Sequence, residues 1–352
     1  MKPGYLFLIP GLLNSFVSIS KGLNDFLNSD HDKIINWLLN GDPSIRWQVH
    51  ADLLYSDQQT IRKERKKITH EGWGARLLSL QDEAGTWANA LYSPKWISTT
   101  YTLLLLRRLG LDPDNQQAQK GAMILLNKGF YKDGGINFFK CYQYGETCVT
   151  SMILSILSYF NIQDKRMISI AEHLLGQQME DGGWNCQRPK GATHGSFHTT
   201  ISVLEGFFEY LEKFSDFKED ILKSRFRAME FLLNHRLFKS HRTGEIVDPK
   251  MTRFSFPPRW RYDVMRSLDY FQKIDAPKDE RFSDAINLLI KKRLPDGRWN
   301  LQGKHAGRVH FEMENTGEPS RWNTLRGMRI LKWWEGINPE SFSSSSATSR
   351  KN

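Results

Sequence analysis

Hydrophobic and polar residues along this chain form a pattern that repeats. A Leu-Leu doublet ends an amphipathic segment six times, and successive doublets lie 39, 48, 49, 58 and 56 residues apart. The doublets are Leu38-Leu39, Leu77-Leu78, Leu125-Leu126, Leu174-Leu175, Leu232-Leu233 and Leu288-Leu289. Self-similarity at such a period is typical of repeat architectures. The segments before the doublets, such as Ile61–Leu80 and Ile221–Leu233, carry one charged face, so we expect outer helices there.

A turn and a more apolar segment follow the doublets. In Asp181-Gly182-Gly183-Trp184 and Asp296-Gly297-Arg298-Trp299, glycine can take the positive φ that closes a helix. The apolar segments begin at Ile45, Ile97, Glu146, Phe197, Arg259 and Arg321. They contain runs such as Leu103–Leu106 that are apolar on every side, which indicates buried helices. The pattern therefore predicts an all-α protein built from six helical hairpins.

Six hairpins form either an open solenoid or a closed ring. Polar capping units are not evident at either end of the pattern, which favours an (α/α)6 toroid of concentric inner and outer helices over residues 30–337. The inner helices would then bring their N-termini to one mouth of the ring. Residues 1–29 are expected to be a leader that packs on the body or is disordered, and the apolar run at 5–13 leaves a secretion signal open. Residues 338–352 read as a disordered Ser-rich tail.

Composition narrows the class of protein. With 39% apolar residues and no apolar run near 18 residues, the chain is expected to be globular and not a helical membrane protein. The net charge of +10 favours an anionic partner, and three cysteines favour reduced thiols in the cytoplasm. No phosphate-binding glycine loop or zinc knuckle appears, so nucleic acid is not expected. The basic run at 62–67 is either a solvated face or a contact with an anionic membrane surface.

The starts of two adjacent inner helices carry metal-binding residue types. Glu146 and Cys148 begin the third inner helix and His198 begins the fourth, and thiolate, imidazole and carboxylate are zinc ligands. Glu146 and Cys148 converge only if Glu146 lies at the helix cap. Cys186 and His194 are further candidate ligands nearby. The structural alternative is a buried thiol and a histidine that caps a helix or bonds in the core.

Basic residues recur beside tryptophan at the predicted mouth. The pairs are Arg46-Trp47, Lys95-Trp96, Arg259-Trp260 and Arg321-Trp322, and Arg253 lies nearby in the sequence. Guanidinium groups suit a diphosphate, and aromatic walls suit an isoprenoid chain or a carbocation. The alternative is arginine stacked on tryptophan and paired with a carboxylate.

Asp263 begins the fifth inner helix. A buried carboxyl group has a raised pKa and can act as a general acid. The alternative is a carboxylate that caps the helix or pairs with arginine.

Repeats with turns like Asp181-Gly182-Gly183-Trp184 resemble the α/α toroid superfamily of terpene cyclases and protein prenyltransferase β-subunits, over about residues 30–335. In those β-subunits an Asp-x-Cys and a histidine hold zinc, and Glu146-Thr147-Cys148 and His198 are similar to them, with Glu in place of Asp. The resemblance implies a zinc-dependent enzyme that transfers a prenyl group to a thiol, and it allows a separate helical partner subunit.

The resemblance also covers squalene–hopene-type cyclases, which protonate their substrate with an Asp-x-Asp-Asp motif. This sequence lacks that motif, and Asp263 is the nearest candidate acid. Metal-free class II cyclisation is therefore one alternative function. A binding or scaffold toroid without catalysis is another.

Overall fold

A computed structural model of the chain describes residues 31–336, and the backbone over this range is predominantly helical. The same range contains isolated β-bridges but no strand, which confirms the expected all-α class. No helix within it is long and apolar enough to cross a membrane. The predicted leader and tail lie outside the described residues.

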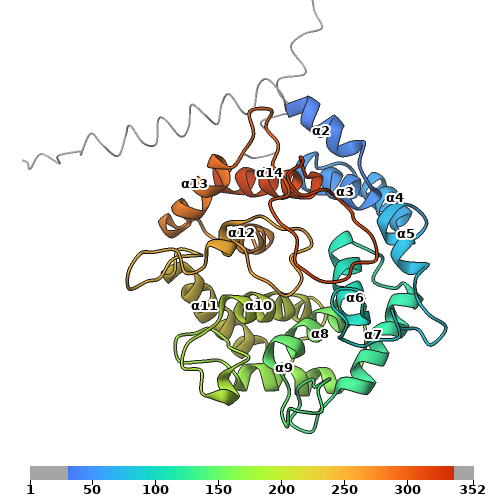
Figure 1. Cartoon of the computed structure of the whole chain (residues 1–352), viewed down its shortest axis with the longest axis vertical. Helices are drawn as coiled ribbons and strands as arrows, with labels where there is room; N and C mark the ends of the chain where they lie inside the picture. Colours follow the sequence, from blue (N-terminus) through green and yellow to red (C-terminus); the bar gives the residue numbers. More distant parts are fainter. Residues whose placement is uncertain (1–30, 337–352) are drawn as a thin grey trace, which may run out of the picture.

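Six helices are buried along most of their length in the described part of the chain. They are α3 (Pro43–Gln48), α6 (Thr99–Leu109), α8 (Thr147–Tyr159), α10 (Phe197–Leu211), α12 (Val264–Lys273) and α14 (Arg321–Glu335). Helix α8 packs between α6 and α10, and α14 packs against both α12 and α3. In Figure 1 the helices α6, α8, α10, α12 and α14 lie nearer the middle of the molecule than their sequence neighbours do.

Seven helices carry an exposed polar face. They are α2 (His31–Leu39), α4 (Gln58–Lys66), α5 (Gly72–Leu78), α7 (Gln116–Gly129), α9 (Arg166–Gly176), α11 (Lys218–Asn234) and α13 (Ser283–Lys291). Helix α7 packs on α6 and on α8, and α5 packs on α6, so the predicted pairing of an outer helix with the inner helix that follows it is present in these two repeats. Helices α9, α11 and α13 pack instead on the inner helix that precedes each of them, which is α8, α10 and α12 respectively. Short helical turns complete the described elements: η1 (Val49–Leu53), η2 (Lys67–Thr69), η3 (Arg188–Lys190), η4 (Pro249–Thr252) and η5 (Glu280–Phe282).

The sequence repeat has a counterpart in hydrogen bonds. Three buried tryptophans follow the turns, and each donates its indole N–H to the carbonyl of a leucine ten residues earlier, at 2.7, 2.8 and 2.8 Å. The backbone N–H of each tryptophan donates to a threonine hydroxyl near the start of the next buried helix. In chain order the triplets are Leu77, Trp87 and Thr99; Leu174, Trp184 and Thr200; and Leu289, Trp299 and Thr324. These bonds fix the turn between the two helices of each hairpin.

Two predicted helices have wrong bounds. The outer helix expected at Ile61–Leu80 is divided into α4, η2 and α5, because Gly72 takes a φ of +66° and Gly74 lies against the Ile68 carbonyl, where a Cβ would overlap. The inner helix expected from Arg259 begins only at Val264. Arg259 has a φ of +59°, outside the right-handed helical region, so residues 259–262 form a turn before the helix.

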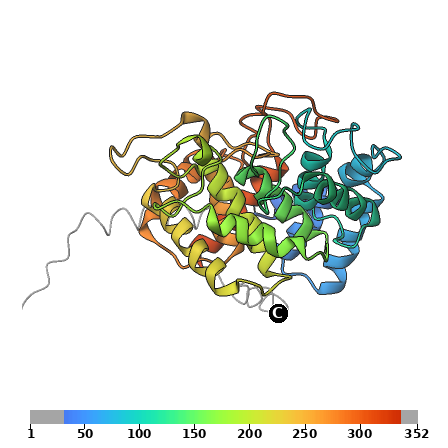
Figure 2. The same ribbon diagram turned by 90° about the horizontal axis from the view of Figure 1, so that it is seen from below.

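Long loops gather on one side of the molecule, as Figure 2 shows along its upper edge. Two of them are joined by backbone hydrogen bonds: Trp96 N–H donates to the Arg308 carbonyl (2.8 Å), and Arg308 N–H donates to the Lys95 carbonyl (3.1 Å). The indole of Trp96 also donates to the carbonyls of His305 and Ala306. The loop before α14 is thereby held against the loop before α6. We call this side the loop end.

Candidate functional site

A cavity with a volume of about 420 Å³ lies between the buried helices. Its walls come from α3, η1, α4, α6, α8, α10, α12 and α14, so segments far apart in the sequence meet there. We call it the central chamber. Its volume falls in the range of small-molecule sites, which is about 300–1,000 Å³.

The walls of the central chamber carry a surplus of positive charge. The basic side chains are Arg65, Arg107, Arg108, Arg266, Lys273, Arg326 and Arg329. The acidic ones are Asp52, Glu205, Glu209 and Asp269, so the lining has three more positive than negative charges. Aromatic rings complete the walls, among them Trp47, Phe256 and Trp322, and the last two stack with centroids 4.1 Å apart. The chamber therefore combines anion-binding groups with apolar aromatic surface.

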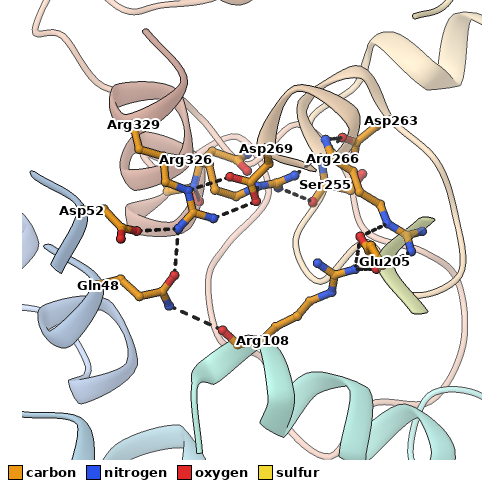
Figure 3. A network of polar contacts seen from close by, with 12 residues as sticks. Gln48, Asp52, Arg108, Glu205, Ser255, Asp263, Arg266, Asp269, Arg326 and Arg329 are labelled. Atoms are coloured by element: carbon orange, nitrogen blue, oxygen red, sulfur yellow. Dashed lines mark hydrogen bonds and ion pairs between the residues drawn. The ribbon is translucent and has the colours of Figure 1, made fainter. Parts of the chain in front are cut away.

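One carboxylate in the chamber forms hydrogen bonds with three arginines. Glu205 on α10 accepts hydrogen bonds from both Arg108 on α6 (2.8 and 2.9 Å) and Arg266 on α12 (2.9 Å to each oxygen), as Figure 3 shows. Arg107 adds a longer contact of 3.2 Å. These charged hydrogen bonds connect three buried helices across the chamber.

A second carboxylate forms a similar centre on α12. Asp269 on α12 accepts two hydrogen bonds from Arg329 on α14, at 2.6 and 2.7 Å, and lies 3.4 Å from Arg326. Arg329 also donates to Gln48 and Asp52, at 2.9 Å each, which ties α14 to α3 and η1 (Figure 3). The two centres make the chamber walls a continuous polar network.

Some buried donors of this network have no hydrogen-bond partner. Within the described residues they include Nε of Arg107 and Nη2 of Arg326, whose side chains are 7% and 3% exposed. Oδ1 of Asp263 lies 4.0 Å from Arg326 Nη2, which is beyond hydrogen-bond distance. A buried N–H without an acceptor costs about 1–3 kcal/mol.

The chamber groups keep their charges. The surrounding guanidinium groups hold the pKa of Glu205 well below its ordinary value, although burial acts in the opposite direction and is the largest single effect. The pKa of Asp269 is lowered in the same way, against burial, by Arg329 and Arg326. Burial lowers the pKa of Arg108 to about 10, so this guanidinium is still charged at neutral pH.

A second cavity, of about 210 Å³, lies at the loop end. Three of the residues singled out in the sequence line it: Asp263, His198 and Arg253. Lys304 and His305 close it from the loop before α14. We call it the Asp263 pocket. Its lining is polar, and Asp263 lies at its base at the start of α12.

Asp263 occupies the cap position of α12. Oδ1 accepts from Arg266 N–H (2.8 Å) and Oδ2 accepts from Ser255 N–H (3.3 Å). Burial raises the pKa of this carboxyl above its ordinary value, and Arg326 at 4.0 Å only partly opposes that effect. Asp263 is thus a buried acid with a raised pKa beside a cavity, and it also has the capping role that the structural alternative assigned to it.

His198 is held as a neutral imidazole. Its Nδ1 accepts a hydrogen bond from Tyr262 N–H (2.8 Å), and its ring packs edge-on against Trp260 at 5.2 Å. Burial, with help from Arg266, lowers the pKa of His198 to about 4. Since Nδ1 is engaged, Nε2 is the nitrogen left for a ligand.

The predicted ligands Cys148 and Cys186 do come together. Glu146 is the cap residue of α8, as convergence required, and Cys148 lies in the first turn. Interaction with Cys186, together with burial, raises the pKa of Cys148, and interaction with Cys148 lowers the pKa of Cys186 to about 6. Burial, followed by Cys186, raises the pKa of Glu146 to about 7.

A complete zinc site is not assembled in the described part of the chain, where no group of three or more His, Cys, Asp and Glu side chains could hold a metal ion. His198 contacts Tyr262 and Trp260, and His194 is exposed in the loop before α10. The cysteine pair beside Glu146 supplies suitable donor types, but the three-ligand arrangement is lacking. Zinc binding stays a prediction.

The basic residues predicted at the mouth do not line the central chamber. Arg46 donates to Glu64 (2.8 Å), and Arg321 lies 4.6 Å from the ring of Trp37. Arg259 lies 5.5 Å from the ring of Trp96. Lys95 lies at the same distance from the ring of Trp260.

The tryptophans of these pairs are divided between the cavities. Trp47 and Trp322 line the central chamber. Trp96 lines a small cavity of about 40 Å³ beneath the loop before α14, and that cavity shares Phe256 with the chamber. Trp260 contacts His198 of the Asp263 pocket.

The arginines and carboxylates of the chamber were not among the site residues predicted from the sequence. A signal was present, because Arg107-Arg108 follows directly on the apolar run Leu103–Leu106, and Glu205 interrupts a helix that is otherwise largely apolar. Charged residues in buried helices are rarely left unpaired, and they mark interior networks.

No family model matches the sequence, and no curated protein matches it at a significant level.

Proposed function

We propose that this protein is an α/α toroid enzyme that binds an isoprenoid diphosphate in the central chamber. The observation that carries the proposal is the chamber itself: a basic surplus, unpartnered guanidinium N–H groups and aromatic walls in one cavity. The toroid arrangement is part of the proposal. It is supported by the packing of α8 on α6 and α10, of α14 on α12 and α3, and by the repeated tryptophan turn.

The chemistry of the ligand follows from the two kinds of wall. Arg107 and Arg326 belong to the basic lining of the chamber, and a guanidinium binds phosphate oxygens strongly. The same groups would stabilise the charge that grows on the diphosphate as its bond to the prenyl carbon breaks. Trp47, Phe256 and Trp322 offer ring faces to the carbon that becomes electron-deficient. The acceptor is left open by these residues.

Calorimetric titration with farnesyl diphosphate tests the proposal, with farnesol and inorganic pyrophosphate as comparison ligands. We expect farnesyl diphosphate to bind more tightly than either, because each comparison ligand engages one kind of wall. Arg326→Gln should weaken binding of the diphosphate about tenfold or more, a loss of about 1.4 kcal/mol or more. Lys273→Met, at a half-exposed rim position, provides a second variant that does not disturb the core.

The matched control is Arg62→Gln, which removes an exposed arginine on α4 outside the chamber. It should leave binding unchanged. No binding of farnesyl diphosphate to the wild-type protein, or equal binding to the wild type and to both chamber variants, excludes the proposal.

A second candidate function rests on the Asp263 pocket. A buried carboxyl group with a raised pKa beside a cavity can protonate an alkene or epoxide, as a metal-free class II cyclase requires. This function predicts turnover of a non-phosphorylated polyprene that survives chelators and is abolished by Asp263→Asn. Asparagine can keep the helix cap, so full activity of that variant would exclude the acid role.

Zinc-dependent transfer to a thiol is the metal-containing form of the first proposal. Glu146, Cys148 and His198, with Cys186 and His194 as further ligands, would have to hold the ion, and a bound zinc ion would lower the pKa of the acceptor thiol. Metal analysis of protein expressed with added zinc tests this form. Zinc well below one equivalent would remove it and leave diphosphate binding in the chamber unaffected.

A further inference from the structure

Two histidines meet where α11 ends. His235 directly follows the last residue of α11, and His241 lies in the turn of residues 239–246 that comes after it. Nδ1 of His241 and Nε2 of His235 are hydrogen-bonded at 3.0 Å. The two rings stand almost perpendicular to each other, with their centroids 4.8 Å apart. Neither histidine lines the central chamber or the Asp263 pocket, so the pair is separate from both functions above.

His235 is held in one orientation and one tautomer. Its ring packs against the rings of Phe231 and Phe197, with centroids 4.6 and 5.2 Å away. Its Nδ1 lies 2.7 Å from the Phe231 carbonyl oxygen. A carbonyl can only accept, so Nδ1 carries the proton, and Nε2 of the neutral ring has a lone pair. Burial lowers the pKa of His235 from its ordinary value, which keeps the ring neutral at pH 7.

The turn that carries His241 is anchored through its backbone. Lys239 N–H donates to the His235 carbonyl at 2.7 Å, and Ser240 N–H donates to the Glu245 carbonyl at 2.8 Å. These bonds join the turn to the end of α11. The side chain of His241 is exposed, so its ring can rotate while the backbone of the turn stays in place.

The separation of the two nitrogens suits ligands of a single metal ion. Imidazole nitrogen binds zinc at about 2.0–2.1 Å, so two such nitrogens at coordination angles of about 90–109° lie about 2.8–3.4 Å apart. The observed 3.0 Å falls within that range. Histidines that bind metals commonly donate their other ring N–H to a backbone carbonyl, and His235 makes such a bond to Phe231. The pair therefore has both the spacing and the supporting hydrogen bond of a metal site.

The charges around the pair are compatible with a cation. The last carbonyls of α11, a helix of 17 residues, place partial negative charge at the end where His235 lies. Two basic side chains of the same segment, Arg236 and Lys239, both pair with Asp284, at 3.7 and 2.8 Å. The carboxylate offsets the repulsion that these side chains would exert on a metal ion.

We propose that His235 and His241 bind one divalent transition-metal ion of the kind that imidazole favours, such as nickel, copper or zinc. His235 binds through Nε2. His241 binds through Nδ1 after the proton on that nitrogen moves to Nε2 of the same ring, so the ring stays neutral. Within residues 31–336 no group of three or more His, Cys, Asp and Glu side chains could hold a metal ion, so water completes the coordination of this two-histidine site.

The bound ion would fasten the turn of residues 239–246 to the end of α11. It would stabilise the folded protein, because the native pair binds the ion more tightly than the two separate histidines of the unfolded chain do.

Isothermal titration calorimetry of the full-length protein with Ni²⁺ tests the proposal. His241→Ala and His235→Gln should each weaken Ni²⁺ binding about tenfold or more. His241 is exposed, so its variant should keep the melting temperature of the wild type when no metal is present. The matched control is His70→Ala, which removes an exposed histidine after η2 and should leave Ni²⁺ binding unchanged.

A chemical footprint identifies the histidines that hold the ion. Diethyl pyrocarbonate modifies accessible imidazoles, and Ni²⁺ should protect His241 but not His70 or His194, which are also exposed. Ni²⁺ should raise the melting temperature of the wild type but not of His241→Ala, and EDTA should reverse the rise.

Three outcomes would overturn the proposal. They are equal Ni²⁺ binding by the wild type and His241→Ala, equal modification of His241 with and without Ni²⁺, and loss of Ni²⁺ binding in His194→Ala, which would assign the ion to the zinc ligands predicted from the sequence. None of these outcomes bears on ligand binding in the chamber.

Discussion

The central chamber and the loop end both bury carboxyl groups, yet the two regions shift the pKa values of those groups in opposite directions. Burial favours the neutral acid at Glu205, Asp269, Asp263 and Glu146 alike. In the chamber, guanidinium groups within hydrogen-bond distance outweigh burial and keep the pKa low. At the loop end, no salt bridge shorter than 4.0 Å reaches Asp263 or Glu146 within residues 31–336, and the pKa of both groups rises. The depth of burial sets the size of the energetic penalty, and the partners decide the sign of the shift.

This difference gives the two regions different chemistry. The chamber holds full charges of both signs at neutral pH, and such a site is prepared for an anion or for charge that develops in a transition state. The loop end holds a carboxyl group, Asp263, with a raised pKa and an imidazole, His198, with a pKa of about 4. Groups of that kind suit proton transfer better than charge stabilisation.

The largest expected effect comes from removing the carboxylate that the chamber arginines share. Glu205→Gln leaves the buried guanidinium groups of Arg108 and Arg266 without their counter-charge, and it leaves Arg107 with Glu209 as its carboxylate partner. Breaking a buried ion pair on one side costs about 3–5 kcal/mol. We expect a loss of that size in the free energy of unfolding, measured by urea denaturation.

The control for this measurement is Glu71→Gln. Glu71 also pairs with an arginine, Arg46, but it is 55% exposed and the contact is 3.5 Å long. Its loss should cost about 1 kcal/mol or less. Equal effects of the two variants would show that the chamber network does not carry the stability assigned to it.

Much of the fold could be predicted from the sequence because it rests on local patterns. The Leu-Leu doublets and the Asp-Gly turns marked the hairpins, and α8, α10 and α14 begin within one residue of the expected positions. The errors arose where backbone geometry overrides apolar periodicity, at Gly72 in the outer helix and at Arg259 before α12. A periodic pattern reports which face is buried, but it does not report a positive φ.

The site was harder to predict because its residues meet only in three dimensions. The sequence pattern drew attention to Glu146, which lies at the cap of α8 as convergence required, and to Cys148 and Cys186, which interact. It could not give the turn before α12 that brings Tyr262 onto His198. The chamber network joins Asp52, near the start of the described chain, to Arg329, near its end, and no local pattern contains that pairing.

The two regions can also be compared through a pair of glycines with the same backbone. Gly110 lines the chamber with a φ of +88°, and Gly191 lies in a loop-end turn with a φ of +92°. A Cβ on Gly110 would overlap the ring of Trp47, whereas a Cβ on Gly191 meets no atom within 4 Å. Gly110→Ala should cost about 1–3 kcal/mol more than Gly191→Ala, which carries only the backbone strain.

Thermal or urea unfolding of the two alanine variants measures this difference. Because the φ angles match, the strain of the backbone cancels and the remainder reports the packing of Trp47. Equal stabilities would mean that Trp47 moves aside freely, and the aromatic wall of the chamber would then not be rigid.

The raised pKa of Glu146 should make a smaller contribution, which appears as a pH dependence of the free energy of unfolding. Its ordinary pKa is 4.5 and its folded value is about 7, so between these values the folded state holds a proton that the unfolded state has released. The folded state binds more protons there, and its stability therefore falls as the pH rises through this window. Glu146→Gln does not titrate, so the stability of the wild type relative to this variant should decline between about pH 4.5 and 7.

Urea midpoints of both proteins across this pH range provide the measurement. Glu335 has a similar raised pKa, but it is present in both proteins and cancels in the difference. A difference that stays constant with pH would contradict the raised pKa of Glu146. If the stability of the wild type relative to Glu146→Gln instead increased with pH, the pKa of Glu146 would be lowered in the folded state, as that of Glu205 is.

The smallest change in the free energy of unfolding should come from removing an ion pair on the loop before α14. Glu312 accepts from Lys304 at 2.6 Å, a contact shorter than most in the chamber, but the Glu312 side chain is 57% exposed. Water already solvates both partners, so Glu312→Gln should change the free energy of unfolding by about 1 kcal/mol or less. If the loss instead approached that of Glu205→Gln, exposure would not separate the two regions, and the short distance alone would have to account for both. A small loss in the free energy of unfolding would support the view that ion pairs stabilise the protein when both partners are buried, as they are in the chamber.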